Sequence, residues 1–314
     1  DGRGLIFISH KLDEVLALAD RITVLRDGRV VGETKPEATS KEELARMMVG
    51  RPVQLAPDKK PSQQGRVRLA IEGLHVEGDR GRRAVDNFSM NVRGGEIVGI
   101  AGVSGNGQRE LAEALAGLRP VTGGRIRLDD NEVTGSTPRE IRGAGLAYVP
   151  EERMRDGVVG EFTVAENLIL LDHNAEPYCR RGVLHMRNVA ERAVTLVERF
   201  NVKTPTIDTI TRSLSGGNIQ KLILARELSA EPTVLVASQP TRGVDIGAAE
   251  YIHRRLVEER DRGTAILVIS EDLDEILTLA DRVAVMFEGR LMAVRDRAAV
   301  RVEEIGLLMA GSGA

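Results

Sequence analysis

The segment GVSGNGQR, from Gly102 to Arg109, has the glycine spacing of a phosphate-binding loop but lacks the two side chains that complete such a loop. In the motif G-x-x-x-x-G-K-[ST], backbone N–H groups cradle phosphates, the lysine contacts the terminal phosphates, and the hydroxyl holds magnesium. Here Gln108 stands in the lysine position and Arg109 in the hydroxyl position. The backbone can still hold an anion, so the candidate phosphate-binding residues are Gly102, Ser104, Gly105, Asn106, Gly107, Gln108 and Arg109.

The two replacements weaken the loop in different ways. Gln108 lacks the positive charge of lysine, and a charged hydrogen bond of that kind contributes about 1.5–3 kcal/mol. Arg109 could restore part of the charge, although from another direction and without binding a metal ion. The alternative is that Arg109 is simply a solvated helix residue.

Composition and charge narrow the classes of protein to consider. The chain has 314 residues, and its 42% hydrophobic content is enough for a full core. Its net charge of −3 provides no global basic field, which argues against nucleic acid as the partner. The single cysteine, Cys179, excludes an internal disulfide framework and fits a reducing compartment. Because no apolar run reaches the ~18 residues of a membrane span, any membrane role must come through a partner.

An internal repeat predicts how the chain is divided. Residues 7–29 align with residues 268–290, and residues 42–50 align with 303–311 at the same offset. Each copy is predicted to form a buried strand, a short helix, a second strand, a glycine turn and a tail helix. The second copy ends a complete domain, whereas the first is expected to end a domain whose beginning is absent, since the chain opens on Asp1 and an apolar strand.

Three parts follow from the repeat. Residues 1–50 are predicted to be the C-terminal end of a truncated first domain. Residues 51–65, rich in proline, glutamine and charge, are predicted to form a linker. Residues 66–314 are predicted to form a complete second domain. Its apolar runs, such as GEIVGIAGV, TVLVAS and AILVIS, alternate with amphipathic helices, which indicates an α/β fold with parallel strands.

The order of five motifs indicates the family. After the glycine-rich loop come YVPEERMRDG at Tyr148, LSGGN at Leu214, VLVASQPTRGVD at Val234 and VISEDLDE at Val268. In this order the sequence resembles the nucleotide-binding domain of an ABC transporter, over residues 66–311, with residues 4–50 resembling the tail of a preceding one. The resemblance implies a P-loop NTPase-like α/β cassette with a mixed-sheet core, a small antiparallel β subdomain and a helical subdomain.

Within that family, the motifs look most like those of importers whose two cassettes are fused and that serve simple sugars or nucleosides. VPEERMRDGVV, with Glu151 where most cassettes have glutamine, is typical of their second cassette. GVSGNGQ, SQPTRGVD and KTPTIDTITRSLSGGN look closest to the nucleoside branch.

The resemblance implies that residues from two cassettes share each ATP. ABC domains pair head to tail, so Ser215, Gly216 and Gly217 would face a nucleotide held by the first cassette, at a helix N-terminus suited to phosphate. His10, which ends the strand of the first repeat copy, would be the catalytic residue that contacts the γ-phosphate of that nucleotide. Asp245 matches the inter-subunit loop aspartate that couples the two sites. A helix cap and an ordinary strand-end histidine are the alternative readings of LSGGN and His10.

The second cassette's own pocket is predicted to be degenerate. Where the family has aspartate and glutamate before Pro-Thr, for magnesium and for the attacking water, this chain has Ser238 and Gln239. Glu271 occupies the position of the γ-phosphate histidine, and no aromatic residue between 66 and 87 can stack on adenine. With Gln108 and Arg109, and with Ser238 and Gln239 counted as one, five features of one pocket are missing, so this pocket is not expected to hydrolyse ATP.

The implied function is the ATP-binding, energy-coupling subunit of an importer at the cytoplasmic face of the membrane. ATP and Mg²⁺ would bind mainly at the site shared with the first cassette, and the isolated chain is expected to be inactive. Partners would be integral-membrane permease subunits, docking at residues 154–167, and indirectly an extracytoplasmic substrate-binding protein. The alternatives are a soluble twin-cassette protein acting on ribosomes or nucleic acid, and an inert nucleotide-binding module.

Overall fold

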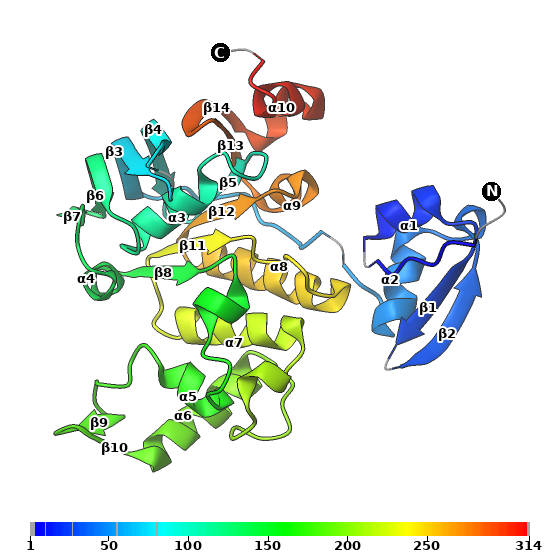
Figure 1. Cartoon of the computed structure of the whole chain (residues 1–314), viewed down its shortest axis with the longest axis horizontal. Coiled ribbons are helices and arrows are strands. Elements are labelled where there is room, and N and C mark those ends of the chain that lie inside the picture. The colour runs from blue at the N-terminus through cyan, green and yellow to red at the C-terminus, as the bar shows by residue number, and fades with distance from the viewer. Residues whose placement is uncertain (1–3, 10, 27, 55, 80, 313–314) are drawn as a thin grey trace.

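The structure is a computed structural model that describes residues 4–9, 11–26, 28–54, 56–79 and 81–312. A larger unit is built around a six-stranded sheet, and a smaller unit precedes it in the chain (Figure 1). The strand order of the central sheet is β14-β13-β5-β12-β11-β8. Its strands are β5 (Ile97–Ala101), β8 (Leu146–Val149), β11 (Val234–Ser238), β12 (Ala265–Ser270), β13 (Arg282–Phe287) and β14 (Arg290–Asp296).

The central sheet is parallel except for its last strand. β5, β11 and β12 are buried along their whole length, as continuous apolar runs in a covered parallel sheet should be. β14 pairs antiparallel with β13, so the sheet is mixed. All five parallel strands end at one edge, because β8, β11, β12, β5 and β13 run in the same direction.

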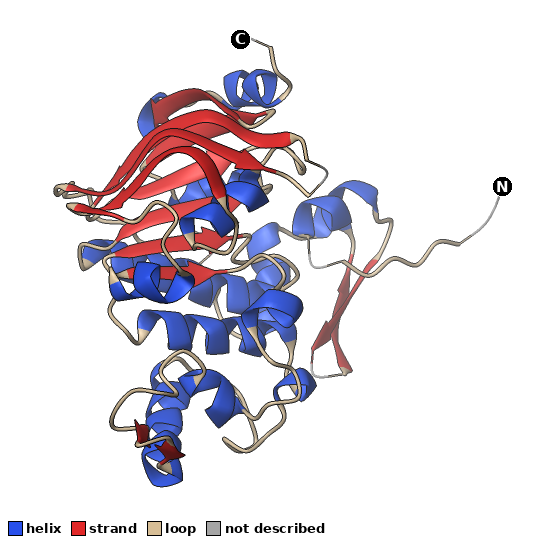
Figure 2. Cartoon of the chain, turned by 60° about the vertical axis from the view of Figure 1, so that its left-hand side comes forward, coloured by secondary structure: helices blue, strands red, loops and turns tan. Residues whose placement is uncertain are grey.

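A second, antiparallel sheet covers one face of the central sheet (Figure 2). Its order is β4-β3-β6-β7, with bounds β3 (Val67–Glu77), β4 (Arg83–Arg93), β6 (Val121–Leu128) and β7 (Asn131–Glu132). Residues on its strands alternate between buried and exposed, which leaves one face for solvent. The helix α3 (Gln108–Leu115) lies between the two sheets and contributes Leu111 and Leu115 to their shared core.

Helices cover the other face of the central sheet and extend away from it as a helical region. α7, α8 and α9 share one hydrophobic core with the sheet and with α5 and α6. A short hairpin, β9 (Cys179–Arg180) and β10 (Val183–Leu184), lies at the far end of this region. The helix bounds are α4 (Pro138–Gly143), α5 (Val164–Ile169), α6 (Met186–Arg199), α7 (Gly216–Leu228), α8 (Ile246–Asp261), α9 (Leu273–Leu279) and α10 (Val302–Met309).

The smaller unit folds like the matching part of the larger one. It consists of α1 (Leu12–Leu18), β1 (Ile22–Arg26), β2 (Arg29–Thr34) and α2 (Lys41–Val49), around a small core of its own. Its β1–β2 hairpin corresponds to the β13–β14 hairpin of the larger unit. Both hairpins have a register shift at the aligned positions, Val24/Leu25 and Val285/Met286, and both turn at a glycine with positive φ.

Residues 51–65, predicted as a linker, lie against the larger unit over much of their length. Lys59 Nζ donates to the carbonyl oxygens of Leu279 and Ala280 at 2.7 and 2.9 Å, and forms an ion pair with Asp281. Burial lowers the pKa of Lys59, against the opposing effect of Asp281. The polar composition of this segment is therefore used for specific contacts and not only for solvation.

Within the described residues, no helix combines the length and the apolar character that a transmembrane span requires.

Candidate nucleotide-binding site

The site is built at the carboxyl edge of the central sheet, where the parallel strands end. The glycine-rich loop follows β5, Gln239 follows β11, and Glu271 follows β12. β12 lies between β5 and β11, and Ala101 is in register with Ser270. Open α/β sheets bind their ligands at this edge. The structure therefore brings together the residues that the sequence placed in the degenerate pocket.

The glycine-rich loop connects β5 directly to α3 and is braced by the turn between β13 and β14. Asn106 Oδ1 accepts a hydrogen bond from Glu288 N at 2.8 Å, and the Asn106 carbonyl accepts one from Gly289 N at 3.0 Å. The Asn106 amide also donates to the Val103 carbonyl at 3.1 Å. Ser104 and Gly105, at the tip of the loop, are exposed. The loop thus has a fixed base and an open tip.

Gln108 is buried, and its side chain turns back toward the loop. Its Nε2 donates to the Val103 carbonyl at 3.2 Å, and a Cβ built on Gly102 would lie 2.4 Å from that nitrogen. The amide is therefore paired with the loop itself and carries no charge toward a phosphate. The side chain at this position therefore supplies no cationic contact of the kind that a lysine would make.

Two glycines of the loop provide a matched test of its backbone. Gly105 and Gly107 have φ of +85° and +96°, but a Cβ on Gly107 would lie 2.0 Å from the Ala84 carbonyl oxygen, whereas nothing lies within 4 Å of one on Gly105. We expect Gly105→Ala to lower the free energy of unfolding by about 1–2 kcal/mol through backbone strain alone. Gly107→Ala should add about 1–3 kcal/mol for the clash. Urea unfolding of the two variants measures both values, and equal losses would contradict the close contact.

Arg109 is paired within its own helix. Its Nε donates to Glu113 Oε1 at 2.7 Å, one turn further along α3. Glu113 also pairs with Arg119 at 2.7 Å, so the positive charges here are held by a common carboxylate. Arg109 therefore behaves as a surface helix residue in this structure, which is the plainer of the two readings of its sequence position.

None of the residues at positions 238, 239 and 271, next to the loop, is a cation that could bind phosphate. Ser238 is buried at the end of β11, and the Oε1 of Gln239 accepts a hydrogen bond from Glu271 N at 3.3 Å. Burial raises the pKa of Glu151, an effect that Arg242 opposes and Glu271 reinforces. Position 238 has no aspartate, and the carboxylates of Glu151 and Glu271 would repel the phosphates of a nucleotide.

A buried polar cluster behind this edge was not predicted from the sequence. The carboxylate of Glu275 accepts hydrogen bonds from Thr241 Oγ1 and Ser270 Oγ, both at 2.6 Å, and lies 2.9 Å from His253 Nε2. These four residues come from α8, α9, the loop after β11 and the end of β12. The cluster therefore ties together four segments around the end of the sheet.

The only sequence signal for this cluster is the repeat. Ser270 and Glu275 align with Ser9 and Glu14, and the same contact recurs there, since Ser9 Oγ donates to Glu14 Oε2 at 3.2 Å. His253 and Thr241 precede the repeated segment, so their roles could not be found by this comparison.

The LSGGN motif forms a second group, at the N-terminus of α7. Ser215 is the exposed N-cap residue, and its side chain makes no capping hydrogen bond to the backbone. Its Oγ instead accepts a hydrogen bond from Asn218 Nδ2 at 2.9 Å, so that the hydroxyl proton is free to donate. Gly217 is buried, and a Cβ on it would lie 2.7 Å from Ala248 Cβ. The two glycines therefore let the backbone approach neighbouring segments closely.

Asp245 lies beside this second group. It caps α8 through its Oδ1, which accepts from Ala248 N at 2.9 Å, and a Cβ on Gly217 would lie 3.2 Å from its Oδ2. Among the described residues, no hydrogen bond or ion pair joins Asp245 or residues 215–217 to residues 102–109. The structure thus brings the predicted site residues together as two groups. The predicted catalytic residue, His10, lies outside the described residues.

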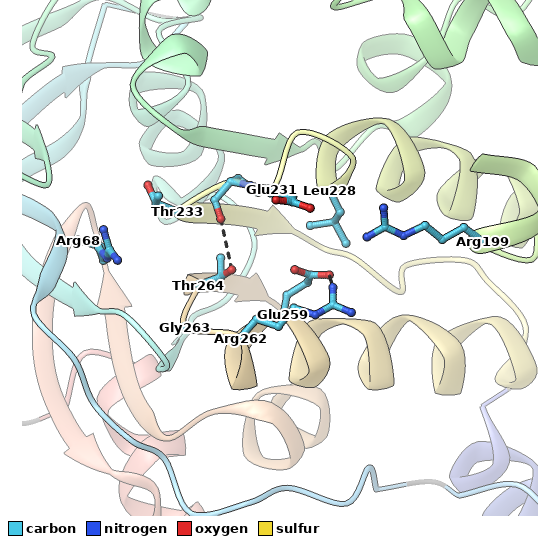
Figure 3. Close-up of a pocket in the computed structure, with 10 residues that line it drawn as sticks. Arg68, Arg199, Leu228, Glu231, Thr233, Glu259, Arg262, Gly263 and Thr264 are labelled. Carbon is cyan, nitrogen blue, oxygen red and sulfur yellow. Dashed lines mark hydrogen bonds and ion pairs between the residues drawn. The ribbon is translucent and has the colours of Figure 1, made fainter. Parts of the chain in front are cut away.

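A cavity of about 460 Å³ opens at the opposite, amino edge of the sheet (Figure 3). Thr233 and Thr264, which precede β11 and β12, line it, and Thr264 Oγ1 donates to the Pro232 carbonyl at 3.3 Å. Of its arginines, Arg262 is paired with Glu259 at 2.6 Å. Sheets of this kind bind ligands at the carboxyl ends of their strands. Because this cavity lies at the amino ends, it is not the nucleotide site. The residues that the structure describes contain no group of three or more His, Cys, Asp or Glu side chains placed to hold a metal ion.

Comparison with known proteins identifies the class that this fold and this site define. The family model described as ABC transporter matches residues 85–242. A nucleotide-free ATP-binding cassette from an ABC transporter superposes with a TM-score of 0.64 at 26% identity, covering 78% of this chain and 96% of that one. The chain belongs to the ABC transporter family. The predicted α/β cassette, with a mixed sheet, a small antiparallel β subdomain and a helical region, is confirmed.

Three similar proteins are named as import ATP-binding proteins. The chain is 44% identical over 99% of its length to the guanosine import ATP-binding protein NupO of Bacillus subtilis, and 44% identical over 99% to the nucleoside import ATP-binding protein NupA of Lactococcus lactis. It is 39% identical over its whole length to the ribose import ATP-binding protein RbsA 1 of Rubrobacter xylanophilus. The chain spans 61%, 62% and 62% of these three proteins.

Proposed function

We propose that this chain is the ATP-binding, energy-coupling part of an ABC importer for nucleosides or simple sugars. The observation that carries the proposal is 44% identity over nearly the whole chain to proteins named for guanosine and nucleoside import. The preserved LSGGN motif, whose Ser215 is exposed at the start of α7, supports a role in ATP hydrolysis. The acidic net charge speaks against the alternative, a soluble twin-cassette protein acting on nucleic acid.

The smaller unit belongs, in this proposal, to a first cassette fused to the second. Its support is the contrast between two copies of one segment. Residues 266–269 are buried in the central sheet, whereas the aligned residues 5, 6 and 8 are 87%, 93% and 99% exposed. The strand β1 offers the same contrast: among the described residues it pairs with β2 alone, whereas the aligned strand β13 also pairs with β5. Strands of a first cassette would cover this apolar surface, because large exposed apolar patches mark interaction sites.

The two cassettes then share one working ATP site. The first cassette, to which His10 belongs, supplies the phosphate loop and the magnesium ligands, while the second cassette supplies Ser215, Gly216 and Gly217 from the opposite side. The pocket around Gln108 and Glu271 remains without hydrolytic activity, for the reasons of charge given above. ATP and Mg²⁺ bind mainly at the shared site, and the isolated 314-residue chain does not turn over ATP.

The membrane partner docks on the helical region at the cytoplasmic face of the membrane. The segment 154–167 carries three large apolar side chains that are substantially exposed, namely Met154, Val159 and Phe162. Arg153, the first residue of the helical turn 153–157, holds this turn to the loop before α8 through hydrogen bonds to the carbonyls of Arg242 and Gly243. A docked permease subunit would therefore contact a segment joined to the LSGGN side of the protein. The substrate-binding protein acts through the permease and does not touch this chain.

Co-purification tests the proposal and separates it from its alternative. We expect the full-length protein to co-purify with a multi-span membrane subunit, and Met154→Asp with Phe162→Asp to reduce the recovered subunit at least tenfold, since interface anchors of this kind dominate binding. Leu307→Asp, on the exposed face of α10, is the matched control and should have no effect. Recovery with ribosomes, and no membrane subunit, would instead favour the twin-cassette alternative.

A further inference from the structure

The carboxylate of Glu250, near the start of α8, is held by two partners from the segment that follows α2. Arg51 contacts it at two points, with Nη1 3.2 Å from Oε1 and Nη2 2.6 Å from Oε2. The backbone N–H of Gln54 also donates to Oε1, at 3.0 Å. The Glu250 side chain is only 11% exposed. A two-point arginine–carboxylate pair fixes orientation as well as distance, so this contact defines how the smaller unit sits on α8.

A continuous path of contacts leads from this pair to the LSGGN motif. Val49, the last residue of α2, lies over Gly247, where a built Cβ would be 3.4 Å from Val49 Cγ1 and 3.3 Å from Asp245 Oδ1. Asp245 caps α8 and lies beside Gly217, as described above. The first turn of α8 is therefore packed between α2 on one side and the motif on the other.

The far end of the connecting segment is fastened as well. Ser62 Oγ donates to the Gly95 carbonyl at 2.8 Å, Gln64 Nε2 donates to Glu96 Oε1 at 3.1 Å, and Arg260 donates to the Lys60 carbonyl at 2.6 Å. The ion pair of Lys59 with Asp281 adds a partly buried anchor. Because residues 59–64 are attached to the larger unit, the pair at residues 51 and 250 is one end of a short, fixed connection.

We propose that Arg51 and Glu250 are positioning residues for ATP hydrolysis. Their ion pair holds α2 against the first turn of α8. It thereby determines the position of Ser215–Gly217 relative to the nucleotide bound by the first cassette. The proposal rests on the shared site of the proposed function. Positioning of this kind affects rate strongly, because a displacement of about 1 Å can slow catalysis about a hundredfold. Since Arg51 is half exposed, the pair contributes little to stability. Loss of the pair should therefore appear in turnover and not in the unfolding temperature.

Charge reversal in the full-length protein tests the role. We expect Arg51→Glu and Glu250→Arg each to lower kcat for ATP at least tenfold, with KM for ATP changed less than threefold and the unfolding temperature unchanged. The double variant, which restores the pair with its ends exchanged, should recover kcat to within threefold. The control is Arg187→Glu, which breaks the exposed Arg187–Glu191 pair of α6 and should leave kcat unaltered. Single variants with normal kcat, or a double variant that is not rescued, would overturn the proposal.

A crosslink keeps the test decisive if the charge variants fold poorly. Val49→Cys and Gly247→Cys, in full-length protein whose other cysteines, Cys179 among them, have been replaced, should form a disulfide on oxidation. Absence of the crosslink overturns the proposed contact. Ser215→Ala distinguishes the two levels of the argument: if it leaves turnover intact, the shared site itself is wrong and the positioning role falls with it. If it abolishes turnover while the charge variants do not, only the positioning role is wrong.

Discussion

Replacement of Ser215 by alanine in the full-length protein is expected to lower ATP turnover by about 10²–10³-fold. The Ser215 hydroxyl is exposed at the N-terminus of α7 and accepts a hydrogen bond from Asn218, so its proton remains free to donate. Loss of one preorganised donor to developing charge typically costs that factor. Because the side chain makes no helix-capping bond, the variant should fold normally. Steady-state ATP hydrolysis measures the effect.

Two control variants are expected to leave ATP turnover almost unchanged. Ser213→Ala removes a nearby exposed hydroxyl that donates to the Ile210 carbonyl at 2.6 Å, and should leave turnover unchanged. Gln108→Lys restores the missing lysine of the degenerate loop, yet should change turnover less than twofold, since Ser238 and Gln239 still provide no carboxylate for magnesium. A large loss on altering Gln108, together with a dispensable Ser215, would mean that the active pocket has been assigned to the wrong cassette.

Replacement of Glu275 by alanine is expected to lower the free energy of unfolding by about 3–5 kcal/mol, because it leaves buried partners unpaired. Glu275 is 5% exposed and serves Thr241, Ser270 and His253 at once. Asp274→Ala, on the exposed side of the same helix, should cost less than about 1 kcal/mol through the helix dipole. Urea unfolding at neutral pH compares the two, and similar losses would show that the buried cluster adds nothing.

The same carboxylate predicts a pH dependence. Burial alone would raise the pKa of Glu275, but the His253 ring and the Ser270 and Thr241 hydroxyls outweigh it, so that the pKa lies below its ordinary value of 4.5. The ionised carboxylate therefore stabilises the fold fully above pH ~4.5, and this contribution is lost as the pH falls through the lower folded-state value. The difference in stability between the natural chain and Glu275→Gln should narrow below pH ~4.5.

The fold of the larger unit could be predicted because its signals are local and strong. Apolar runs without alternation marked β5, β11 and β12 as buried parallel strands, and the glycine spacing marked the loop between β5 and α3. The placement of Gln239 and Glu271 in one pocket followed from the resemblance of the motifs to those of ABC cassettes. These features are determined by residues that are close together in the sequence, so they can be predicted without knowledge of distant contacts.

Contacts between distant polar residues could not be predicted in the same way. In the sequence, Glu275 is indistinguishable from the other charged residues of a short helix. It becomes buried only when α8 and α9 pack together. Arg51 and Lys59 sit in a segment whose composition is typical of a solvated linker, yet each has a carboxylate partner more than 190 positions away. A pattern of residue types contains no information about which of many carboxylates such a side chain will meet.

The two hairpins, β1–β2 and β13–β14, have a consequence for how the protein folds. The second hairpin extends a parallel sheet, while the first forms a two-stranded sheet of its own within the described part of the chain. Both nevertheless adopt the same irregularity at the aligned position. The register of each strand pair is thus determined by the residues of the hairpin itself and does not depend on pairing with the parallel sheet. Structure of low contact order forms early, so β13–β14 should be among the first parts of the larger unit to form, before the parallel strands assemble beside it.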